Sequence, residues 1–412
     1  MILAAGQCMI LAKECRTPGG GDMKGIWGRV SKLIPLAFSL AMVSACSYSK
    51  STNLDARLQS LLADLVRNDS SVKNCLLSVR SGDGSFTWSG AAGMAGDQSP
   101  MTEDTPVYIA SITKLYTATV IMRLWEKGAL SLDDPMSKYL PMESVSGIHV
   151  YRGKDYSNQI TIKQLLSHSS GIADYYEEKG RDGKSLFDMF LENQDRRWTV
   201  EETIERVRKN MKPNFPPGEG TSYSDTNFQL LGKIVEAVTG KPLVKAYEDF
   251  VFFPLGLRHT YLVGFSQDQT QRFTAPAEVF YKKTNITKIR TNGAYWAEGG
   301  IVSTADEMTI FLKALNEGRI VGLDTLRLMH DWRRWHFPLE YGFGTMLFRV
   351  PRPMRSLMKM PALWGHSGST GSFLYYCKDA DLYLAGTIDQ ADSQIKPFFL
   401  MYRAIRAIQR SR

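Results

Sequence analysis

Cysteine is scarce in this sequence. Its 412 residues include five cysteines, Cys8, Cys15, Cys46, Cys75 and Cys377, and no two of them form a Cys-x-x-Cys pair. A disulfide-rich scaffold and a thiolate zinc site need more cysteines or closer ones, so neither is indicated. Cys75 and Cys377 fall in strand-like runs, where we expect buried thiols. In an oxidising compartment, a disulfide between these two is the alternative.

Basic runs and metal-binding spacings are also missing. The formal net charge is +8, but residues 1–46 alone hold five Lys or Arg against two Asp or Glu, and no run of five basic residues occurs. Nucleic-acid binding is therefore not indicated, and the charge implies at most a weak attraction to anionic surfaces. The histidines are scattered without a His-x-x-x-His pair, and no phosphate-loop motif is present. We therefore expect neither a metal ion nor a cofactor.

No apolar run is long enough to span a bilayer comfortably, but one near the N-terminus has the pattern of an export signal. Three basic residues between positions 24 and 32 precede the apolar run 33–43, which ends in Val-Ser-Ala-Cys46. This order is typical of a secretory signal, with a short buried helix as the alternative. The end of the run resembles the lipobox of bacterial lipoproteins. That resemblance implies lipidation of Cys46, and Ser47 in place of Asp implies the outer membrane.

The rest of the chain has ordinary globular composition, with 43% hydrophobic and 22% charged residues. Strand-like runs occur near the start, at 74–79 and 85–90, and again near the end, at 341–348, 371–376 and 382–387. Between them the pattern is mostly helical. This order predicts an α+β fold, in which one antiparallel sheet is built from both ends of the chain and is flanked by helices.

The same pattern predicts the domain organisation. We expect a leader and lipoprotein signal over 1–46 and a tether over 47–55. Residues 56–130 and 295–412 are predicted to form the sheet domain, and residues 131–294 an inserted, mostly helical subdomain.

One serine stands at the start of a predicted helix. Apolar residues recur at helical spacing from Leu115 to Trp125, so Ser111 begins this helix and Lys114 follows one turn later on the same face. A serine hydroxyl needs a base within hydrogen-bond reach, and a lysine can serve when burial lowers the pKa of its amine. No Gly-x-Ser-x-Gly motif occurs, which argues against an α/β-hydrolase. Taken alone, the Ser-x-x-Lys spacing also fits an ordinary amphipathic helix.

Two further stretches carry residues that suit the same chemistry. Tyr223 lies on a turn that enters a helix, where its phenol could move protons near a lysine. The stretch 364–371, Trp-Gly-His-Ser-Gly-Ser-Thr-Gly, stands at the head of a strand, and its glycines allow the backbone to approach a ligand closely.

Together these stretches resemble the serine β-lactamase and penicillin-binding-protein superfamily, of the class C β-lactamase and D-alanyl-D-alanine carboxypeptidase type. The Ser-x-x-Lys motif is at Ser111, and the Tyr-x-Asn motif of the class C type is matched at 223–225. The Lys/His-x-Gly motif is matched at 366–368, and the stretches 165–171 and 215–218 also fit. The resemblance covers about residues 55–405.

The resemblance implies a role for each matched residue. Ser111 would be the acylated nucleophile, and Lys114 and Tyr223 would share the proton transfers. The backbone N–H groups of Ser111 and Ser369 would form the oxyanion hole. Asp225 and the run His366, Ser367, Gly368 and Ser369 would bind the substrate.

Two positions depart from the superfamily pattern. Asp225 stands where Asn is usual, and a carboxylate can only accept hydrogen bonds and would hold Lys114 charged. His366 replaces a permanent cation with a group that titrates near pH 6.5, which weakens it as an anchor for a substrate carboxylate. Both changes are compatible with an enzyme that hydrolyses esters.

The sequence therefore predicts an exported, lipid-anchored serine hydrolase that faces the periplasm. Its expected substrate is a small molecule or a peptidoglycan-derived D-alanyl peptide or related amide, with β-lactams as a further option. An esterase on small acyl esters is the first alternative, and a non-catalytic cell-wall-binding protein on the same fold is the second. His168 is expected to be a structural hydrogen bonder, and the sequence leaves open whether Tyr175, Tyr176 and Trp364 line the substrate site or pack in the core.

Overall fold

The computed structural model describes residues 54–96, 98–266, 274–292, 294–351, 353, 355 and 360–411. The predicted leader and lipid-attachment residue Cys46 lie outside the described residues, as does the tether up to residue 53. Among the helices of the described part, none combines the length and the apolar character that crossing a membrane requires.

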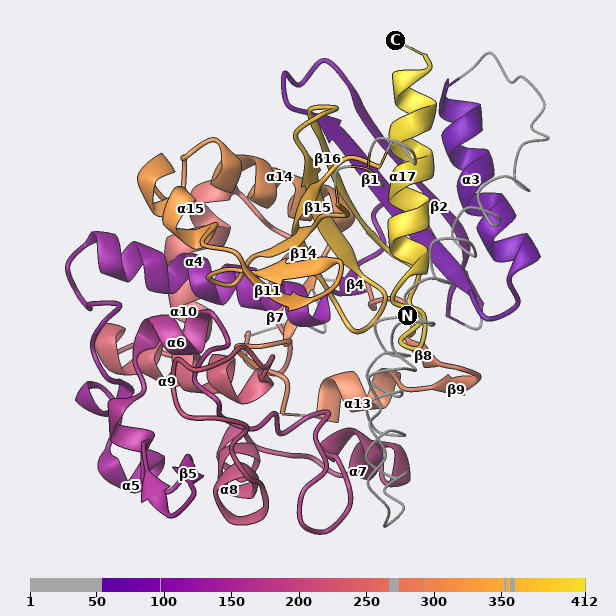
Figure 1. Ribbon diagram of the computed structural model, residues 1–412. Coiled ribbons are helices and arrows are strands. Elements are labelled where there is room, and N and C mark those ends of the chain that lie inside the picture. The colour runs from indigo at the N-terminus through magenta and orange to yellow at the C-terminus, as the bar shows by residue number, and fades with distance from the viewer. Residues whose placement is uncertain are drawn as a thin grey trace.

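Strands from both ends of the described chain form one antiparallel sheet (Figure 1). Its order is β11-β12-β13-β14-β15-β16-β1-β2-β3, so the first strand pairs with the last. A short second sheet has the order β4-β10-β7. The strands of these two sheets are β1 (Asn74–Ser81), β2 (Thr87–Gly96), β3 (Ser99–Pro100), β4 (Val107–Tyr108), β7 (Tyr261–Leu262), β10 (Ile301–Ser303), β11 (Arg333–His336), β12 (Leu339–Tyr341), β13 (Met346–Phe348), β14 (Leu363–Ser367), β15 (Phe373–Cys377) and β16 (Leu382–Thr387). Two small hairpins add β5 (Val150–Tyr151) with β6 (Lys154–Asp155), and β8 (Phe280–Tyr281) with β9 (Thr284–Asn285).

Helices fill the region between the two groups of strands and cover both faces of the large sheet. They are α3 (Leu54–Asn68), α4 (Thr113–Glu126), α5 (Met142–Val145), α6 (Ile162–Leu166), α7 (Leu186–Glu192), α8 (Val200–Asn210), α9 (Asp225–Thr239), α10 (Leu243–Tyr247), α11 (Phe253–Leu255), α13 (Thr287–Asn292), α14 (Ala305–Asn316), α15 (Leu323–Met329) and α17 (Lys396–Gln409). The described residues also form short turns. They are the 3₁₀ turns η1 (Ala110–Ile112), η2 (Met136–Lys138) and η3 (Ser157–Gln159) and the π turn η4 (Glu248–Phe252).

The alternation of side chains along the central strands divides the core into two layers. On β1, Leu77 and Val79 pack with Leu384 of β16 under α3 and α17. These two helices come from opposite ends of the described chain and lie side by side on one face of the sheet (Figure 1). Leu76 instead belongs to the larger core on the other face, which includes Phe311 of α14. The predicted antiparallel sheet flanked by helices is therefore confirmed, while the boundaries of the two predicted domains stay a prediction.

Local signals in the sequence located several elements well. Thr199 caps α8 through a full capping box with Glu202, as its spacing predicts. The expected single strand over 341–348 is wrong, because the chain turns at residues 342–345 between β12 and β13, and Gly344 adopts a left-handed φ of 68°.

Cys75 and Cys377 are buried free thiols, as expected, and burial raises the pKa of each to about 12.

Candidate active site

Ser111 lies in a strained backbone turn at the entrance to α4. It is the middle residue of η1, and Ala110 before it has a left-handed φ of 47°, which is unfavourable for a residue with a Cβ. The turn is held because Ile301 N–H donates to Thr113 Oγ1 at 3.1 Å and Ile109 N–H donates to the Ile301 carbonyl at 3.1 Å. Ser111 itself is half-buried and accessible to solvent.

Lys114 is completely buried beside the serine hydroxyl. Its Nζ lies 3.1 Å from Ser111 Oγ, 2.8 Å from the Glu298 carbonyl oxygen and 2.5 Å from Asp225 Oδ1. Lys114 thus donates two hydrogen bonds, to Ser111 Oγ and to the Glu298 carbonyl, and forms an ion pair with Asp225. This ion pair is the arrangement expected of a charged Lys114.

Tyr223 reaches the same serine from the other side of the site. It precedes Ser224, the N-cap residue of α9, and its ring centroid lies 4.9 Å from Lys114 Nζ. The Ser111 hydroxyl hydrogen-bonds the phenol oxygen, which favours the phenolate, but desolvation and the nearby Asp225 carboxylate raise the pKa of Tyr223 well above its usual value. The structure thus brings Ser111, Lys114 and Tyr223 together, as the sequence predicts.

The Tyr223 ring is packed between two other rings. His168 lies 4.3 Å away between centroids, and Trp335 stacks on Tyr223 at 5.1 Å with an interplanar angle of 22°. His168 also accepts a hydrogen bond at Nδ1 from Ser224 N–H at 3.1 Å, which confirms its predicted structural role. Sequence reasoning missed Trp335, because it lies on a charged edge strand more than a hundred residues away from Tyr223.

Asp225 forms a buried ion pair with Lys114, as its carboxylate predicts. Its side chain is 10% exposed, and its backbone N–H donates to Asp174 Oδ1 at 2.9 Å. Asp174 is itself buried, and burial together with the Asp225 charge raises its pKa well above the usual value. The buried Asp174 thus holds the Asp225 backbone, while the Asp225 carboxylate pairs with Lys114.

Glu298 is a site residue that the sequence did not reveal. Its carbonyl oxygen accepts from Lys114, and its carboxyl group accepts from the Tyr175 hydroxyl at 2.8 Å and from Trp296 N–H at 3.0 Å. Burial raises the pKa of Glu298 to about 7, with a further contribution from Asp225. Tyr175 is thus a buried packing residue that orients Glu298. Trp364 is also buried, and it packs edge-to-face against His330.

His366 is not the charged, exposed anchor that its motif position implies. The side chain is completely buried, Nε2 accepts from the Tyr341 hydroxyl at 3.1 Å, and Nδ1 donates to the Ser367 carbonyl at 2.7 Å. Burial and the nearby Lys114 charge lower the pKa of His366 to about 3, so the ring is neutral. Both ring nitrogens already have protein partners, which leaves none for a substrate carboxylate.

The loop after His366 lies directly against the segment that precedes Ser111. Thr370 Oγ1 donates to the Tyr108 carbonyl at 2.7 Å, and Ser372 Oγ donates to the Ile109 carbonyl at 2.8 Å. A Cβ on Gly368 would lie 2.3 Å from the Ile109 carbonyl oxygen, so this approach requires glycine. Ser367 and Ser369 are half-buried, and the Ser367 hydroxyl is hydrogen-bonded to the Tyr375 hydroxyl at 2.7 Å. The loop therefore positions the Ser369 backbone close to Ser111.

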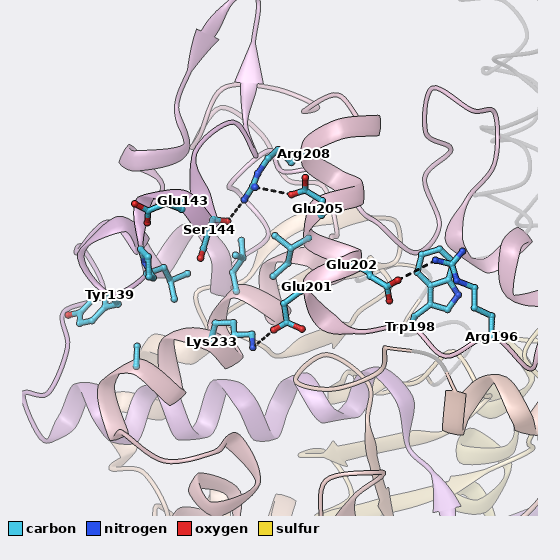
Figure 2. A pocket seen from close by; sticks show the side chains of 15 residues that line it. Tyr139, Glu143, Ser144, Arg196, Trp198, Glu201, Glu202, Glu205, Arg208 and Lys233 are labelled. Atoms are coloured by element: carbon cyan, nitrogen blue, oxygen red, sulfur yellow. Dashed lines mark hydrogen bonds and ion pairs between the residues drawn. The ribbon is translucent and has the colours of Figure 1, made fainter.

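A separate groove of about 790 Å³ lies on the helical part of the molecule (Figure 2). Several of its charged side chains pair with each other: Lys233 lies 2.6 Å from Glu201, and Arg208 lies 2.8 Å from Glu205. None of the residues around Ser111 lines this groove. Within the described residues, no group of three or more His, Cys, Asp or Glu side chains is arranged to hold a metal ion.

Comparison with known proteins agrees with this geometry. A D-stereospecific amidohydrolase from Streptomyces has a similar structure, with a TM-score of 0.67 and 28% identity over 86% of this chain and 98% of its own. Among curated sequences, esterase EstB of Burkholderia gladioli is 31% identical over 60% of this chain and 58% of its own. An Escherichia coli (strain K12) protein with a provisional D-alanyl-D-alanine carboxypeptidase name is 28% identical over 64% of each chain.

The matched region spans less than two thirds of the length of these two curated relatives. The sequence pattern that defines the Beta-lactamase family, however, matches residues 77–396, which include Ser111, Tyr223 and His366. The fold, the convergence of the three motifs and this match lead to one conclusion: the chain belongs to the beta-lactamase family.

Proposed function

We propose that the protein is a serine hydrolase that acts through an acyl-enzyme on Ser111. The observation that carries this proposal is the position of Ser111 Oγ, which lies 3.1 Å from Lys114 Nζ and is also hydrogen-bonded to the Tyr223 oxygen. A half-exposed hydroxyl between an amine and a phenol is arranged for nucleophilic attack. The strained turn at Ala110 holds it there.

The contacts of Lys114 favour Tyr223 as the group that takes the serine proton. Lys114 donates to Ser111 Oγ and to the Glu298 carbonyl and is ion-paired with Asp225, and as an ammonium group it has no lone pair to accept the proton. Tyr223 acts as a base only as the phenolate, and burial and Asp225 raise its pKa; the Ser111 hydrogen bond and the Lys114 charge, 4.9 Å from the ring centroid, act in the opposite direction. In this mechanism Ser111 Oγ bonds to the substrate carbonyl carbon, and the Tyr223 phenolate accepts the serine proton and passes it to the leaving amine or alcohol as the bond to that group breaks.

The tetrahedral intermediate needs donors for its oxyanion. The backbone N–H groups of Ser111 and Ser369 are the candidates, because the 366–372 loop is fixed against residues 108–110. A water molecule then attacks the acyl carbon by the reverse proton path, which releases the acid and restores the Ser111 hydroxyl.

The substrate that we propose is a small amide, such as a D-aminoacyl amide or a D-alanyl peptide derived from the cell wall. The names of the amidohydrolase and carboxypeptidase relatives support this choice. An ester is the second candidate, favoured by Asp225, because a carboxylate at this position cannot donate to an amide substrate's carbonyl and an ester has a better leaving group. Hydrolysis of a nitrophenyl ester and of a D-alanyl-D-alanine peptide by one preparation would separate the two; hydrolysis of neither would reject both.

Replacing Asp225 by asparagine will raise acylation by β-lactams. The Asn amide can donate a hydrogen bond to the lactam side chain, and the negative charge 2.5 Å from Lys114 is removed. We expect the rate of labelling by a fluorescent penicillin to rise about tenfold, the effect of one additional hydrogen bond of ordinary strength. The exposed Asp133→Asn variant removes an equal charge elsewhere and should label like the wild type. Unchanged or slower labelling of Asp225→Asn would contradict this account of the position.

We also propose that the protein is exported and held on the periplasmic side of the outer membrane by lipid on Cys46. The apolar run 33–43 and the Val-Ser-Ala-Cys46 sequence support this proposal. Cys46→Ser should abolish incorporation of labelled palmitate and move the protein from the membrane to the soluble fraction. Palmitate incorporation that survives this substitution would rule out Cys46 as the attachment point, and Cys75→Ser, at a buried thiol, is the matched control.

A further inference from the structure

We propose that Trp335 is a positioning residue for the reaction, because its indole fixes the orientation of the Tyr223 ring beside Ser111. The inference rests on the proposed hydrolase function and deepens it, since it adds a residue that acts on the chemistry only through Tyr223. Trp335 lies on β11, an edge strand of the large sheet, and belongs to none of the three sequence motifs.

The Tyr223 ring is held by two neighbouring rings. The indole of Trp335 stacks on it with 5.1 Å between centroids and an interplanar angle of 22°, and the His168 ring lies 4.3 Å from it. His168 is itself fixed, because its Nδ1 accepts from Ser224 N–H at 3.1 Å. Stacked aromatic pairs are favourable, so a rotation of the Tyr223 ring away from its present orientation would lose the stack on Trp335.

Tyr341 supports both members of the stack from the side. Its ring meets Tyr223 edge-on at 5.8 Å and 83°, and it meets Trp335 edge-on at 6.1 Å and 86°. Its hydroxyl donates to His366 Nε2 at 3.1 Å. Edge-to-face contacts are also favourable, so the hairpin of β11 and β12 connects Tyr223 of the second motif with His366 of the third.

A β-bulge directs Trp335 toward Tyr223. Arg334 pairs with Glu340 and His336 pairs with Leu339, so Trp335 is one extra residue on β11. An extra residue of this kind interrupts the alternation of a strand and redirects one side chain. The other three side chains of β11 are exposed, whereas Trp335 is half-buried. The bulge thus gives an exposed edge strand one side chain that packs on Tyr223.

Trp335 also packs at the margin of the core that lies under α3 and α17, so its replacement can affect stability as well. A residue that served only this packing would change the unfolding temperature and leave the kcat of the folded enzyme unchanged. A positioning residue changes kcat, because a misplaced phenolate lies out of hydrogen-bond reach of the serine proton. Leucine keeps an apolar side chain without a planar ring, and phenylalanine keeps the ring, so these two replacements separate packing from stacking.

Hydrolysis of p-nitrophenyl acetate by the purified full-length chain tests the proposal, with thermal unfolding measured on every variant. We expect Trp335→Leu to lower kcat about tenfold at unchanged KM, the scale of one lost aromatic pair. Trp335→Phe should remain within about threefold of the wild type, because the ring is retained. Trp198→Leu is the matched control. It changes a half-buried tryptophan that packs on Arg196 in the groove away from Ser111, and it should keep the wild-type kcat.

Tyr223→Phe supplies a background in which the proposed role disappears. Without the phenol oxygen, adding Trp335→Leu should change kcat by less than about twofold. A further loss of about tenfold in this background would show that Trp335 acts on something other than Tyr223 and would overturn the proposal. The same conclusion would follow from an effect on KM alone, from an unchanged kcat in Trp335→Leu, or from Trp335→Phe being as slow as Trp335→Leu. Absence of ester hydrolysis by the wild type would instead count against the proposed function, so the two failures are distinguishable.

Discussion

Ser111→Ala will reduce ester hydrolysis about 10⁴-fold or more, because the atom that forms the acyl-enzyme is removed. The hydroxyl is half-exposed and Ala110 and Thr113 keep their contacts, so the variant should fold like the wild type. Lys114 and Tyr223 would remain in place without a nucleophile between them. The measurement is kcat/KM for a nitrophenyl ester, with thermal unfolding as the test of structure.

A matched control separates this effect from the loss of any serine. Ser85→Ala changes an exposed residue in the turn between β1 and β2 and should leave kcat/KM unchanged. Activity in Ser111→Ala within tenfold of the wild type would show that another group is the nucleophile.

Tyr223→Phe will reduce kcat/KM about 10²- to 10³-fold, the range of one positioned general acid–base group. The phenylalanine ring keeps the stack on Trp335 and the contact with His168, so the change removes the oxygen and little else. Because Lys114 is ion-paired with Asp225 and donates to Ser111 and to the Glu298 carbonyl, it is poorly placed to replace the phenol as base. The measurement is the rate of nitrophenyl ester hydrolysis under single-turnover conditions.

Tyr151→Phe, on the short hairpin strand β5, is the control for removing a phenol oxygen away from Ser111. It should hydrolyse the ester at the wild-type rate. A Tyr223→Phe variant that retains more than a tenth of the wild-type rate would show that Lys114 alone accepts the serine proton.

Much of the fold follows from local sequence signals. The helix predicted from the apolar spacing between Leu115 and Trp125 agrees with α4, because such spacing is decided within one or two turns. The break between β12 and β13 was missed because residues 341–348 are mostly apolar and aromatic, and only the tertiary structure shows that Gly344 turns left-handed. Strand β11 was missed because Arg333 and Arg334 make it look like a loop.

The site was only partly predictable for a similar reason. Ser111, Lys114, Tyr223 and Asp225 belong to motifs with recognisable spacing, and the structure brings them into contact. Other parts depend on long-range packing that no local pattern encodes. Glu298 accepts the Lys114 hydrogen bond through its backbone carbonyl, which every residue type has, so its side chain could not identify it in the sequence as a contact of Lys114. Trp335 stacks on Tyr223 because the edge strand β11 lies next to the site, a contact between residues far apart in the sequence.

His366 illustrates the limit of reading a role from a motif position. The motif placed it beside the site, but burial decided its charge: the ring is enclosed by Tyr341 and the Ser367 carbonyl, and its pKa falls to about 3. With Asp225 paired to Lys114, the site therefore has less positive charge than the matched motifs imply. This difference underlies the prediction that Asp225→Asn reacts faster with β-lactams.

The central claim is that the Ser111 hydroxyl is the nucleophile on which the acyl group is carried. Intact-mass spectrometry after brief exposure to a slowly hydrolysed acyl ester tests it most directly, followed by fragmentation of the modified peptide. We predict one added acyl group on the wild-type chain, mapped to the peptide that contains Ser111, and no added mass on Ser111→Ala. An acyl group on the Ser111→Ala chain, or on a different residue of the wild type, would contradict the claim.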